Sequence, residues 1–358
     1  MKMKKSFVFQ ALAAVAVFAA GCNSGSGTDD KTAAVAGGTK PAAAGGDCTP
    51  TTGPIKIGFI VKSMGDSWFQ TETNFAKEEA KTLGAEIDVQ EALNGSAVLS
   101  TIDTMATNGV QGIIICSPET QLGKAIKAAT DRHKIKLMSV DDRLVGSDGK
   151  PLTEIPHLGI SATNIGKQVG QSIADEIKKR GWKMEDVGAL AITVPTLQTA
   201  KERVEGAESV LTAGGFKKEN IIEAPWSGAV DIASASDAAN AVLTAHASIK
   251  KWVVFSSNDD GVLGGIRSIS NRGIPPTDII GVGINGMLAA KEWEKGTPTG
   301  MFASILLQSK VHGANTVKMM DEWIKACTKP ALETYTDGAV INKDNYKDAL
   351  TKAGVSIK

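Results

Sequence analysis

The fold is decided by the stretch Ile55-Lys-Ile-Gly-Phe-Ile-Val-Lys-Ser-Met-Gly-Asp-Ser-Trp-Phe69. Its apolar run stops at Lys62 and gives way to a loop that carries Asp66, Trp68 and Phe69. This pattern predicts a buried strand that delivers charged and aromatic groups to its end. A cation, a carboxylate and an indole on one short loop would suit a ligand rich in hydroxyl groups with one apolar face, which describes a sugar.

Beyond this stretch, short runs rich in Val and Ile alternate with amphipathic segments, which is typical of a parallel sheet covered on both faces. The expected strands are 55–61, 85–89, 112–116, 136–140, 188–193, 221–224, 251–256, 279–283, 301–307 and 338–342. The expected helices are 69–83, 99–108, 122–132, 165–180, 199–213, 234–246, 261–272, 288–294 and 311–326. Because large open sheets tend to split, we expect an α/β fold of two doubly wound lobes with a break near 157–163.

The N-terminal region predicts export. Residues 1–21 hold lysines followed by an apolar stretch, as in a secretory signal. The small residues before Cys22 resemble a bacterial lipobox, in which the cysteine is lipidated, and a plain secretory signal is the alternative. Residues 22–54 are small and polar apart from Val35, so we expect a disordered tether. Signal and tether together predict a periplasmic or cell-envelope location, with a lipid anchor in a membrane.

Composition excludes several classes of partner. The chain has 39 basic and 39 acidic residues, and removal of the signal lysines leaves a slight acidic excess, which argues against nucleic acid. The cysteines Cys22, Cys48, Cys116 and Cys327 lack CxxC spacing, and the four histidines are scattered. The sequence therefore indicates no metal site and no cofactor.

The residues that follow the expected strands are polar and can make several hydrogen bonds. Ligands of open parallel sheets bind outside the carboxyl ends of the strands. The candidate residues there are Lys62, Asp66, Trp68, Phe69, Cys116, Asp141, Asp142, Leu197, Thr199, Arg203, Asn258 and Asn285. Each polar one could alone be a turn or capping residue. Their coincidence at six strand ends predicts a site for a polyhydroxylated ligand.

One pattern favours a different class of ligand. Gly281-Val-Gly-Ile-Asn-Gly286 fits the glycine spacing of dinucleotide-binding folds. However, the next expected strand, 301–307, ends without an acidic residue for a ribose. We therefore set the NAD hypothesis aside.

A family resemblance runs in register over most of the chain. It is carried by Lys62, Ser67-Trp-Phe-Gln-Thr-Glu72, Cys116, Val140-Asp-Asp142, Gln198-Thr-Ala200, Asn258-Asp259, Val262-Leu-Gly-Gly265 and Gly283-Ile-Asn-Gly286. In these residues the chain from Ile55 onward resembles the periplasmic sugar-binding proteins of type I, and within them the arabinose-binding members. The resemblance implies two lobes joined by a three-segment hinge near 160–162, 305–308 and 335–338. Lobe 1 would comprise 55–160 plus 309–335, and lobe 2 would comprise 161–308 plus 336–358.

The resemblance also implies that the protein binds a ligand and does not catalyse a reaction. The chain would be a monomeric solute-binding protein of an ABC sugar importer, closing its hinge on L-arabinose or a related aldose such as galactose or fucose and docking on the permease. A sugar sensor that docks on a membrane receptor or kinase is the alternative. A sugar-responsive repressor would need a basic helix-turn-helix before Ile55, where this chain has a signal and a tether.

Roles for individual residues follow from the same resemblance. Lys62 and Asp142 would bind hydroxyls near the anomeric centre, Arg203 the ring oxygen, and Asn258 and Asn285 further hydroxyls. Trp68 and Phe69 would pack on the ring, while Cys116, Asp141, Leu197 and Thr199 would line or brace the pocket. Four positions depart from the family. Asp66 replaces a glutamate, Leu288 an aspartate, and Ile160 and Ser257 methionines, which leaves the identity of the sugar open.

The two cysteines without a counterpart in the family suggest a disulfide. The resemblance would place Cys327 on lobe 1, where the chain enters near Cys48. Extracytoplasmic proteins can form disulfides. We therefore expect a Cys48–Cys327 bridge that staples the tether to lobe 1.

Overall fold

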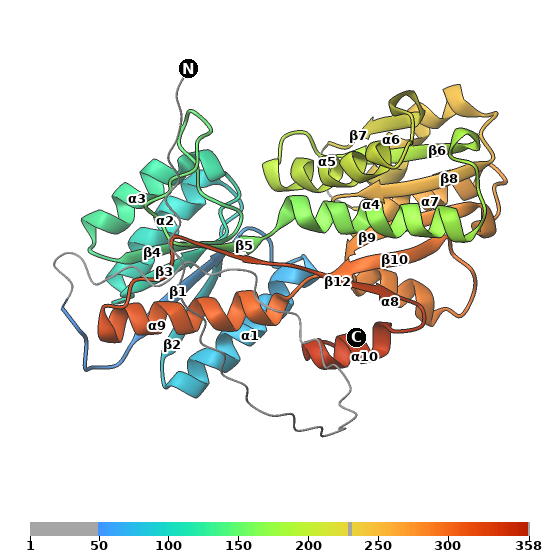
Figure 1. Cartoon of the computed structure of the whole chain (residues 1–358). Coiled ribbons are helices and arrows are strands. Elements are labelled where there is room, and N and C mark those ends of the chain that lie inside the picture. The colour runs from blue at the N-terminus through green and yellow to red at the C-terminus, as the bar shows by residue number, and fades with distance from the viewer. Residues whose placement is uncertain (1–48, 228–230, 357–358) are drawn as a thin grey trace, which may run out of the picture. The chain divides into compact units, whose positions relative to one another are not determined.

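The computed structural model describes residues 49–227 and 231–356, which form two six-stranded sheets with helices packed on both faces of each (Figure 1). The expected signal, Cys22 with its expected lipid, Cys48 and most of the expected tether lie outside the described residues. Throughout the described part of the chain, each helix is too short or too polar to cross a bilayer.

The first sheet is entirely parallel. Its strand order is β11-β5-β4-β3-β1-β2. Its strands are β1 (Lys56–Val61), β2 (Glu86–Glu91), β3 (Gly112–Ile115), β4 (Lys136–Asp141), β5 (His157–Ile160) and β11 (Glu333–Thr336). Helices α1 (Ser67–Leu83) and α9 (Thr316–Ala326) pack on one face, and α2 (Gly95–Thr107) and α3 (Gly123–Arg132) on the other.

The second sheet repeats this plan with one antiparallel edge. Its strand order is β12-β10-β9-β8-β6-β7, and β12 runs antiparallel to β10. Its strands are β6 (Val187–Thr193), β7 (Ile221–Pro225), β8 (Lys251–Ser256), β9 (Ile279–Asn285), β10 (Met301–Leu306) and β12 (Ala339–Asn342). Helices α4 (Ala162–Lys179) and α5 (Gln198–Ala213) cover one face, and α6 (Ile232–Leu243), α7 (Asp259–Ser270), α8 (Met287–Glu294) and α10 (Tyr346–Ala353) cover the other.

Strand β1 is central because successive residues are buried on opposite faces of the sheet. Phe59 faces the core under α1 and α9, whereas Ile60 faces the core under α2 and α3, and both are fully buried. A strand buried on both faces needs apolar residues in succession, as this stretch provides. Helix α1 begins after Asp66, whose carboxylate accepts a hydrogen bond from the Trp68 N–H at 2.8 Å, and ends at Gly84 in the left-handed conformation. The cap fixes where Trp68 enters the site region.

The predicted fold class is confirmed, with local corrections. The chain passes between the sheets after β5, after β10 and again after β11. The segment 157–163, expected to be only an extended break, contains strand β5, and strand β11 was not predicted. The expected helix 311–326 begins with a π-helical turn, η6 (Val311–Asn315), before α9. The proposed lobe boundaries stay a prediction.

Candidate ligand-binding site

Both sheets have a point where the strand order reverses, and the candidate residues follow the strands at these points. Strands β2 and β3 flank β1 in the first sheet, and β7 and β8 flank β6 in the second. Crevices form at such points because neighbouring connections leave in opposite directions. Lys62, Cys116 and Asp142 follow β1, β3 and β4; Thr199, Arg203 and Asn258 follow β6 and β8.

Asp142 is the residue on which these groups converge. Its Oδ2 forms an ion pair with the Lys62 ammonium and lies 3.7 Å from the Cys116 thiol. Its Oδ1 accepts a hydrogen bond from the Thr199 hydroxyl at 2.9 Å. Because Lys62 and Asp142 follow strands of the first sheet and Thr199 lies in α5 of the second, the structure brings candidates from both lobes together at one carboxylate.

The charges at this point stabilise one another. Burial alone would favour neutral Asp142, but Lys62, Thr199 and Arg203 hold the pKa of this carboxyl below its usual range. Burial likewise opposes a charged Lys62, yet Asp142 raises the pKa of this ammonium above its usual value. Burial raises the pKa of the Cys116 thiol, which leaves it a small neutral group beside the pair. The pair thus stays ionised and offers both a donor and an acceptor.

Arg203 supplies a further donor from the second lobe. It lies one helical turn after Thr199 in α5, so both side chains lie on the same face of the helix. Its Nη1 donates to the Ser257 carbonyl at 2.7 Å, whereas its buried Nε has no partner among the described residues. A buried guanidinium N–H without a partner costs free energy, and a ligand acceptor would remove this cost. Leu197 precedes α5 and is half-buried.

The two asparagines lie at the ends of secondary-structure elements, one before a helix and one at the end of a strand. Asn258 caps α7, with its side-chain oxygen accepting from the Gly261 N–H at 3.0 Å. Asn285 ends β9 with a φ of 104°, a conformation that is unusual for a non-glycine residue. Trp68 and Asn285 line the same small pocket.

Asp259, which sequence reasoning did not single out as a ligand residue, fixes the loop after Asn285. Its Oδ2 accepts from the backbone N–H groups of Gly286 at 3.0 Å and Ala289 at 3.1 Å, and its Oδ1 accepts from the Ser304 hydroxyl at 2.6 Å. A Cβ at Gly283 would lie 2.2 Å from Asp259 Oδ1. Two glycines of the GxGxxG pattern lie inside β9, and the one at 283 makes room for this carboxylate.

The residues of the first loop differ in exposure. Phe69 is 4% exposed in the core of the first lobe, 5.9 Å beneath the Lys62 ammonium, and Asp66 is an exposed cap of α1. Trp68 is half-buried and packs against the cores of both lobes. Its indole N–H donates to Asp141 Oδ2 at 3.1 Å. The predicted ligand contacts of these three residues stay predictions.

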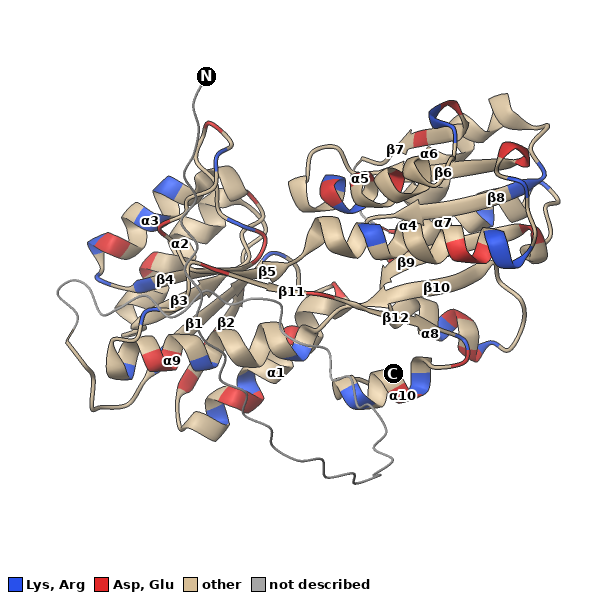
Figure 2. Cartoon of the chain, viewed as in Figure 1, with Lys and Arg blue, Asp and Glu red and all other residues tan. Residues whose placement is uncertain are grey.

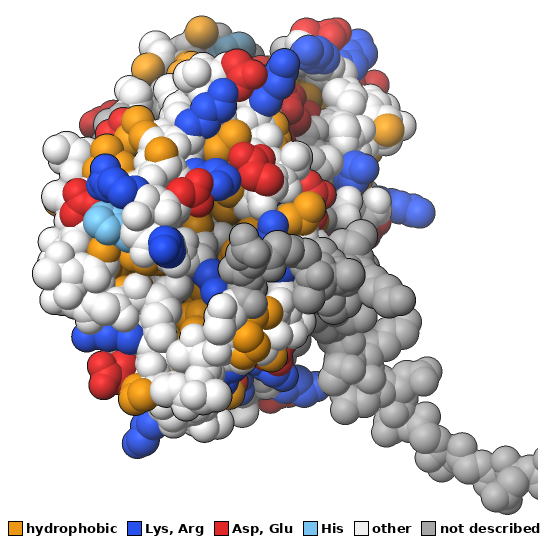
Figure 3. Space-filling model, turned by 90° about the vertical axis from the view of Figure 1, so that its left-hand side faces the viewer, with side chains coloured by type: hydrophobic (Ala, Val, Ile, Leu, Met, Phe, Trp, Pro, Cys, Tyr) orange, Lys and Arg blue, Asp and Glu red, His pale blue; other side chains and the backbone are white. Residues whose placement is uncertain are grey.

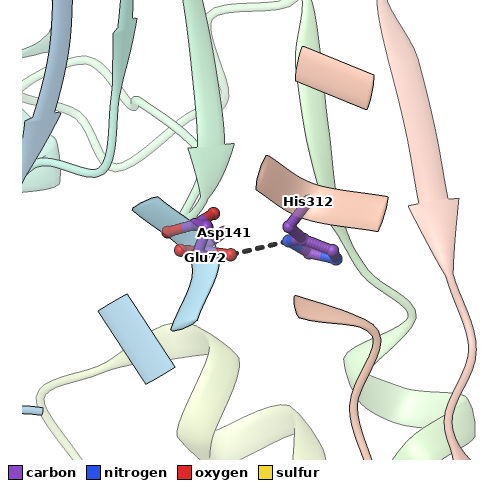
Figure 4. A group of neighbouring side chains, drawn as sticks. All are labelled: Glu72, Asp141 and His312. Carbon is purple, nitrogen blue, oxygen red and sulfur yellow. Dashed lines mark hydrogen bonds and ion pairs between the residues drawn. The ribbon is translucent and has the colours of Figure 1, made fainter. Parts of the chain in front are cut away.

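Two buried neighbours of the candidate residue Asp141, Glu72 and His312, were not predicted as part of the site from sequence. Glu72, Asp141 and His312 have side-chain donor and acceptor atoms within 4.8 Å of one another, and Figure 4 shows them facing each other from α1, the end of β4 and η6. The signal for Glu72 was its helical spacing, since Phe69, Glu72, Thr73, Ala76 and Ala80 form the buried face of α1. Only the fold could place His312 beside it.

Asp141 and His312 are joined by a hydrogen bond rather than arranged as metal ligands, and both carboxyl oxygens of Glu72 are buried without a hydrogen-bond partner among the described residues. His312 Nδ1 lies 2.7 Å from Asp141 Oδ1. Two ligands of a tetrahedral ion, each about 2.1 Å from the metal, would be separated by roughly 3.4 Å. Burial, followed by the nearby Asp141 carboxylate, raises the pKa of Glu72 well above its usual value. Burial thus favours the protonated form of Glu72, whose O–H would be a donor facing the Asp141 carboxylate.

Comparisons with known proteins show which family the chain resembles. The family described as periplasmic binding proteins and sugar binding domain of LacI family matches residues 55–349. The ABC transporter L-arabinose-binding periplasmic protein of Azospirillum brasilense is 43% identical, over 84% of this chain and 90% of that protein. The L-arabinose-binding periplasmic protein of Escherichia coli K12 is 38% identical, over 85% and 92%.

Solved structures show the same fold. A periplasmic ribose ABC transporter protein from Conexibacter woesei superposes with a TM-score of 0.69 at 20% identity, covering 84% of this chain and 96% of that chain. The arabinose-binding component from Shewanella sp. ANA-3, solved with L-arabinofuranose, gives 0.68 at 18% identity, covering 83% and 95%. With the family match extending over residues 55–349, this chain belongs to the family of periplasmic binding proteins and sugar-binding domains of the LacI family.

Proposed function

We propose that this chain binds a monosaccharide, L-arabinose or a related aldose such as galactose or fucose, as the substrate-binding component of an ABC importer. The observation that carries the proposal is its 43% and 38% identity to two L-arabinose-binding proteins over most of each chain. The convergence of Lys62, Cys116 and Thr199 on Asp142 supports it, because an ionised pair with free hydrogen-bonding capacity suits sugar hydroxyls.

The mechanism we propose is closure of the two lobes on the sugar. Lys62 and Asp142 belong to the first lobe, whereas Arg203 belongs to the second. A sugar that contacts both sets at once binds the closed form more tightly than the open form. This difference in affinity shifts the population toward closure, and the permease would recognise the closed form.

Two departures from the resembled family bear on which sugar binds. Leu288 replaces an aspartate and packs against the core of the second lobe, and Asp66 replaces a glutamate and caps α1. A ligand hydroxyl left without its partner in a buried site costs about 1–3 kcal/mol. The chain is therefore expected to prefer a sugar that lacks or inverts the hydroxyl these groups would have met.

Calorimetry of the purified chain tests the proposal against arabinose, galactose, fucose, xylose, ribose and glucose. We expect one sugar to bind at least about tenfold more tightly than the others, and Asp142→Ala to abolish binding because the sugar and buried Lys62 both lose a charged partner. Asp175→Ala, an exposed carboxylate on α4, is the matched control and should bind as the parent does. Absence of heat with all six sugars would contradict the function, and unchanged affinity of Asp142→Ala would remove Asp142 from the site.

The family indicates a periplasmic location, and we propose that Cys22 carries a lipid anchor there. Labelling of cells with a clickable fatty acid should mark the chain but not Cys22→Ser; equal labelling would contradict the anchor.

We further propose that the chain acts as a monomer. The described large apolar side chains that are exposed are only Leu93, Leu332 and Val340, and charges of both signs are interspersed over the helices (Figure 2). On the face in Figure 3, small groups of hydrophobic side chains lie among charged and other polar ones. Stable association of copies usually buries a larger apolar surface.

A further inference from the structure

Asp141 has a backbone conformation that a non-glycine residue rarely adopts. Its φ is 60°, and the N–H of Asp142 donates to the carbonyl of Val140 at 2.7 Å. A hydrogen bond between residues i+2 and i closes a γ-turn, which in the positive-φ form is rare and strained. Such strain persists only where surrounding contacts hold it. Because Asp142 is the next residue, the shape of this turn sets the direction of its carboxylate.

The backbone of Asp141 pairs with Gly159 of β5, and three further side chains surround its carboxylate. Trp68 Nε1 donates to Oδ2 at 3.1 Å, and His312 Nδ1 lies 2.7 Å from Oδ1. The buried carboxyl of Glu72 faces the same carboxylate (Figure 4). Trp68 and His312 also pack edge to face, with ring centroids 5.3 Å apart. The turn is thus anchored from α1 on one side and from His312 on the other.

His312 lies where the chain passes between the lobes. It belongs to η6, which follows the passage from β10 of the second sheet to the first. Its Nε2 lies 2.7 Å from the Thr336 hydroxyl, and Thr336 is the last residue of β11, before the chain returns to the second sheet. A Cβ at Gly313 would lie 2.1 Å from the Glu72 carbonyl, so glycine allows η6 to lie against α1. Two of the three connections between the sheets therefore meet at one imidazole.

We propose that His312 is a positioning residue that couples these two connections to the Asp141 turn, and so to the orientation of Asp142. The inference deepens the proposed sugar-binding function and rests on it. Rotation of the lobes changes the backbone of the connections, and the imidazole transmits that change to the turn. By linkage, a sugar bound at Asp142 biases the connections by the same free energy.

The test separates the two ends of the imidazole. In His312→Gln, the longer amide keeps a polar group near the position of Nε2, so the contact to Thr336 remains and the contact to Asp141 is lost. In His312→Asn, the shorter amide keeps a polar group near the position of Nδ1, so the contact to Asp141 remains and the contact to Thr336 is lost. Thr336→Val removes the same contact from its other end. His157→Gln is the matched control, because His157 is also buried in the first lobe and bonded to Ser139, while no hydrogen bond among the described residues joins its side chain to the turn.

Two measurements are made on each variant of the full chain. The first is the dissociation constant for L-arabinose by calorimetry. The second is the distance distribution between the lobes without sugar, by single-molecule energy transfer between encoded fluorophores at the exposed positions Lys124 and Lys218. We expect His312→Gln to weaken binding about tenfold and to broaden the distribution, since a buried charge-assisted hydrogen bond is lost.

The other variants should follow a set order. His312→Asn and Thr336→Val should each weaken binding about threefold, and the double variant should be no worse than either alone, because both cut one contact. His157→Gln should stay within about twofold. An unchanged distance distribution for His312→Gln contradicts the coupling, and so does equal weakening by His157→Gln, which would reveal a merely structural role. If the parent chain binds no sugar, the proposed function fails while the sugar-free distribution still decides the coupling.

Discussion

At the scale of single residues, the site depends on carboxylates that carry different protonation states. Lys62 holds the pKa of the Asp142 carboxyl below its usual range, whereas burial raises the pKa of Glu72 well above it. Asp259 lies between these extremes, because burial raises its pKa to about 7 despite hydrogen bonds from Ser304 and from the backbone of Ala289 and Gly286. The environment of Asp142 therefore favours the charged carboxylate, whereas burial of Glu72 and Asp259 favours the protonated acid.

The raised pKa of Asp259 predicts a pH dependence of stability. The folded state binds this proton more tightly than the unfolded chain, whose carboxyl has a pKa near 3.8. The free energy of unfolding should therefore fall as pH rises from about 4 to about 7. Asp259→Asn should make this fall smaller by on the order of 1–3 kcal/mol, because an amide does not titrate. The variant should still fold, since its amide N–H can donate to Ser304 while its amide oxygen accepts from the backbone. Urea unfolding at pH 5 and pH 8 measures it.

The control for this prediction is Asp175→Asn, which changes an exposed carboxylate on α4. It should leave the pH dependence as in the parent chain. If Asp259→Asn shows the full parental fall between pH 5 and pH 8, Asp259 is not the group responsible.

At the scale of elements, the packing of α4 against α5 places two site residues. A Cβ at Gly166 of α4 would lie 2.0 Å from the carbonyl of Arg203, so the two helices touch backbone to backbone. Gly166→Ala must push α5 away, and α5 carries Thr199 and Arg203. We expect a loss of about 1–3 kcal/mol in unfolding free energy, and weaker sugar affinity at temperatures where the variant is folded. Urea unfolding and calorimetry measure the two effects.

A matched glycine distinguishes displacement from a general effect of alanine. Gly214 follows α5 with a φ of −78°, and a Cβ there would meet its nearest atom at 3.3 Å. Gly214→Ala should retain parental affinity. Parental affinity in Gly166→Ala would show that α5 can shift without moving its side chains out of the site.

The elements also show how far sequence alone reaches. Apolar runs such as those of β1 and β8 identify buried strands, because a strand covered on both faces has no polar positions. Strand β11 is short and polar, with the sequence Glu-Thr-Tyr-Thr, and was missed since an edge strand needs no apolar run. The strand-end rule led to Lys62, Asp142 and Thr199, which do converge. The rule could not lead to His312, because His312 does not follow a strand of the first sheet and lies far from Asp141 in the sequence. Only the passage of the chain between the lobes brings the two residues together.

At the scale of the whole molecule, three passages of the chain connect the lobes. The loop of chain between the two cysteines of the candidate disulfide contains almost all of both lobes. Cys327 is disulfide-bonded, while Cys48 lies outside the described residues, so their pairing stays a prediction. The Thr51 N–H donates to the Ile324 carbonyl at 3.3 Å, which brings the start of the described chain to the end of α9, next to Cys327.

A bridge from Cys48 to Cys327 would close a loop that contains both sheets. Such a bridge stabilises the folded state chiefly by restricting the unfolded chain, and for a loop this long the entropic contribution is about 5 kcal/mol. We expect reduction to lower the unfolding free energy by about 2–5 kcal/mol, measured by guanidinium unfolding with and without reductant. Cys327→Ser should show the lower stability in both conditions. Thiol counting on the denatured, unreduced chain should find neither Cys48 nor Cys327 free. Two free thiols beyond Cys116 and Cys22 would contradict the pairing, because the bond of Cys327 would then be absent in solution.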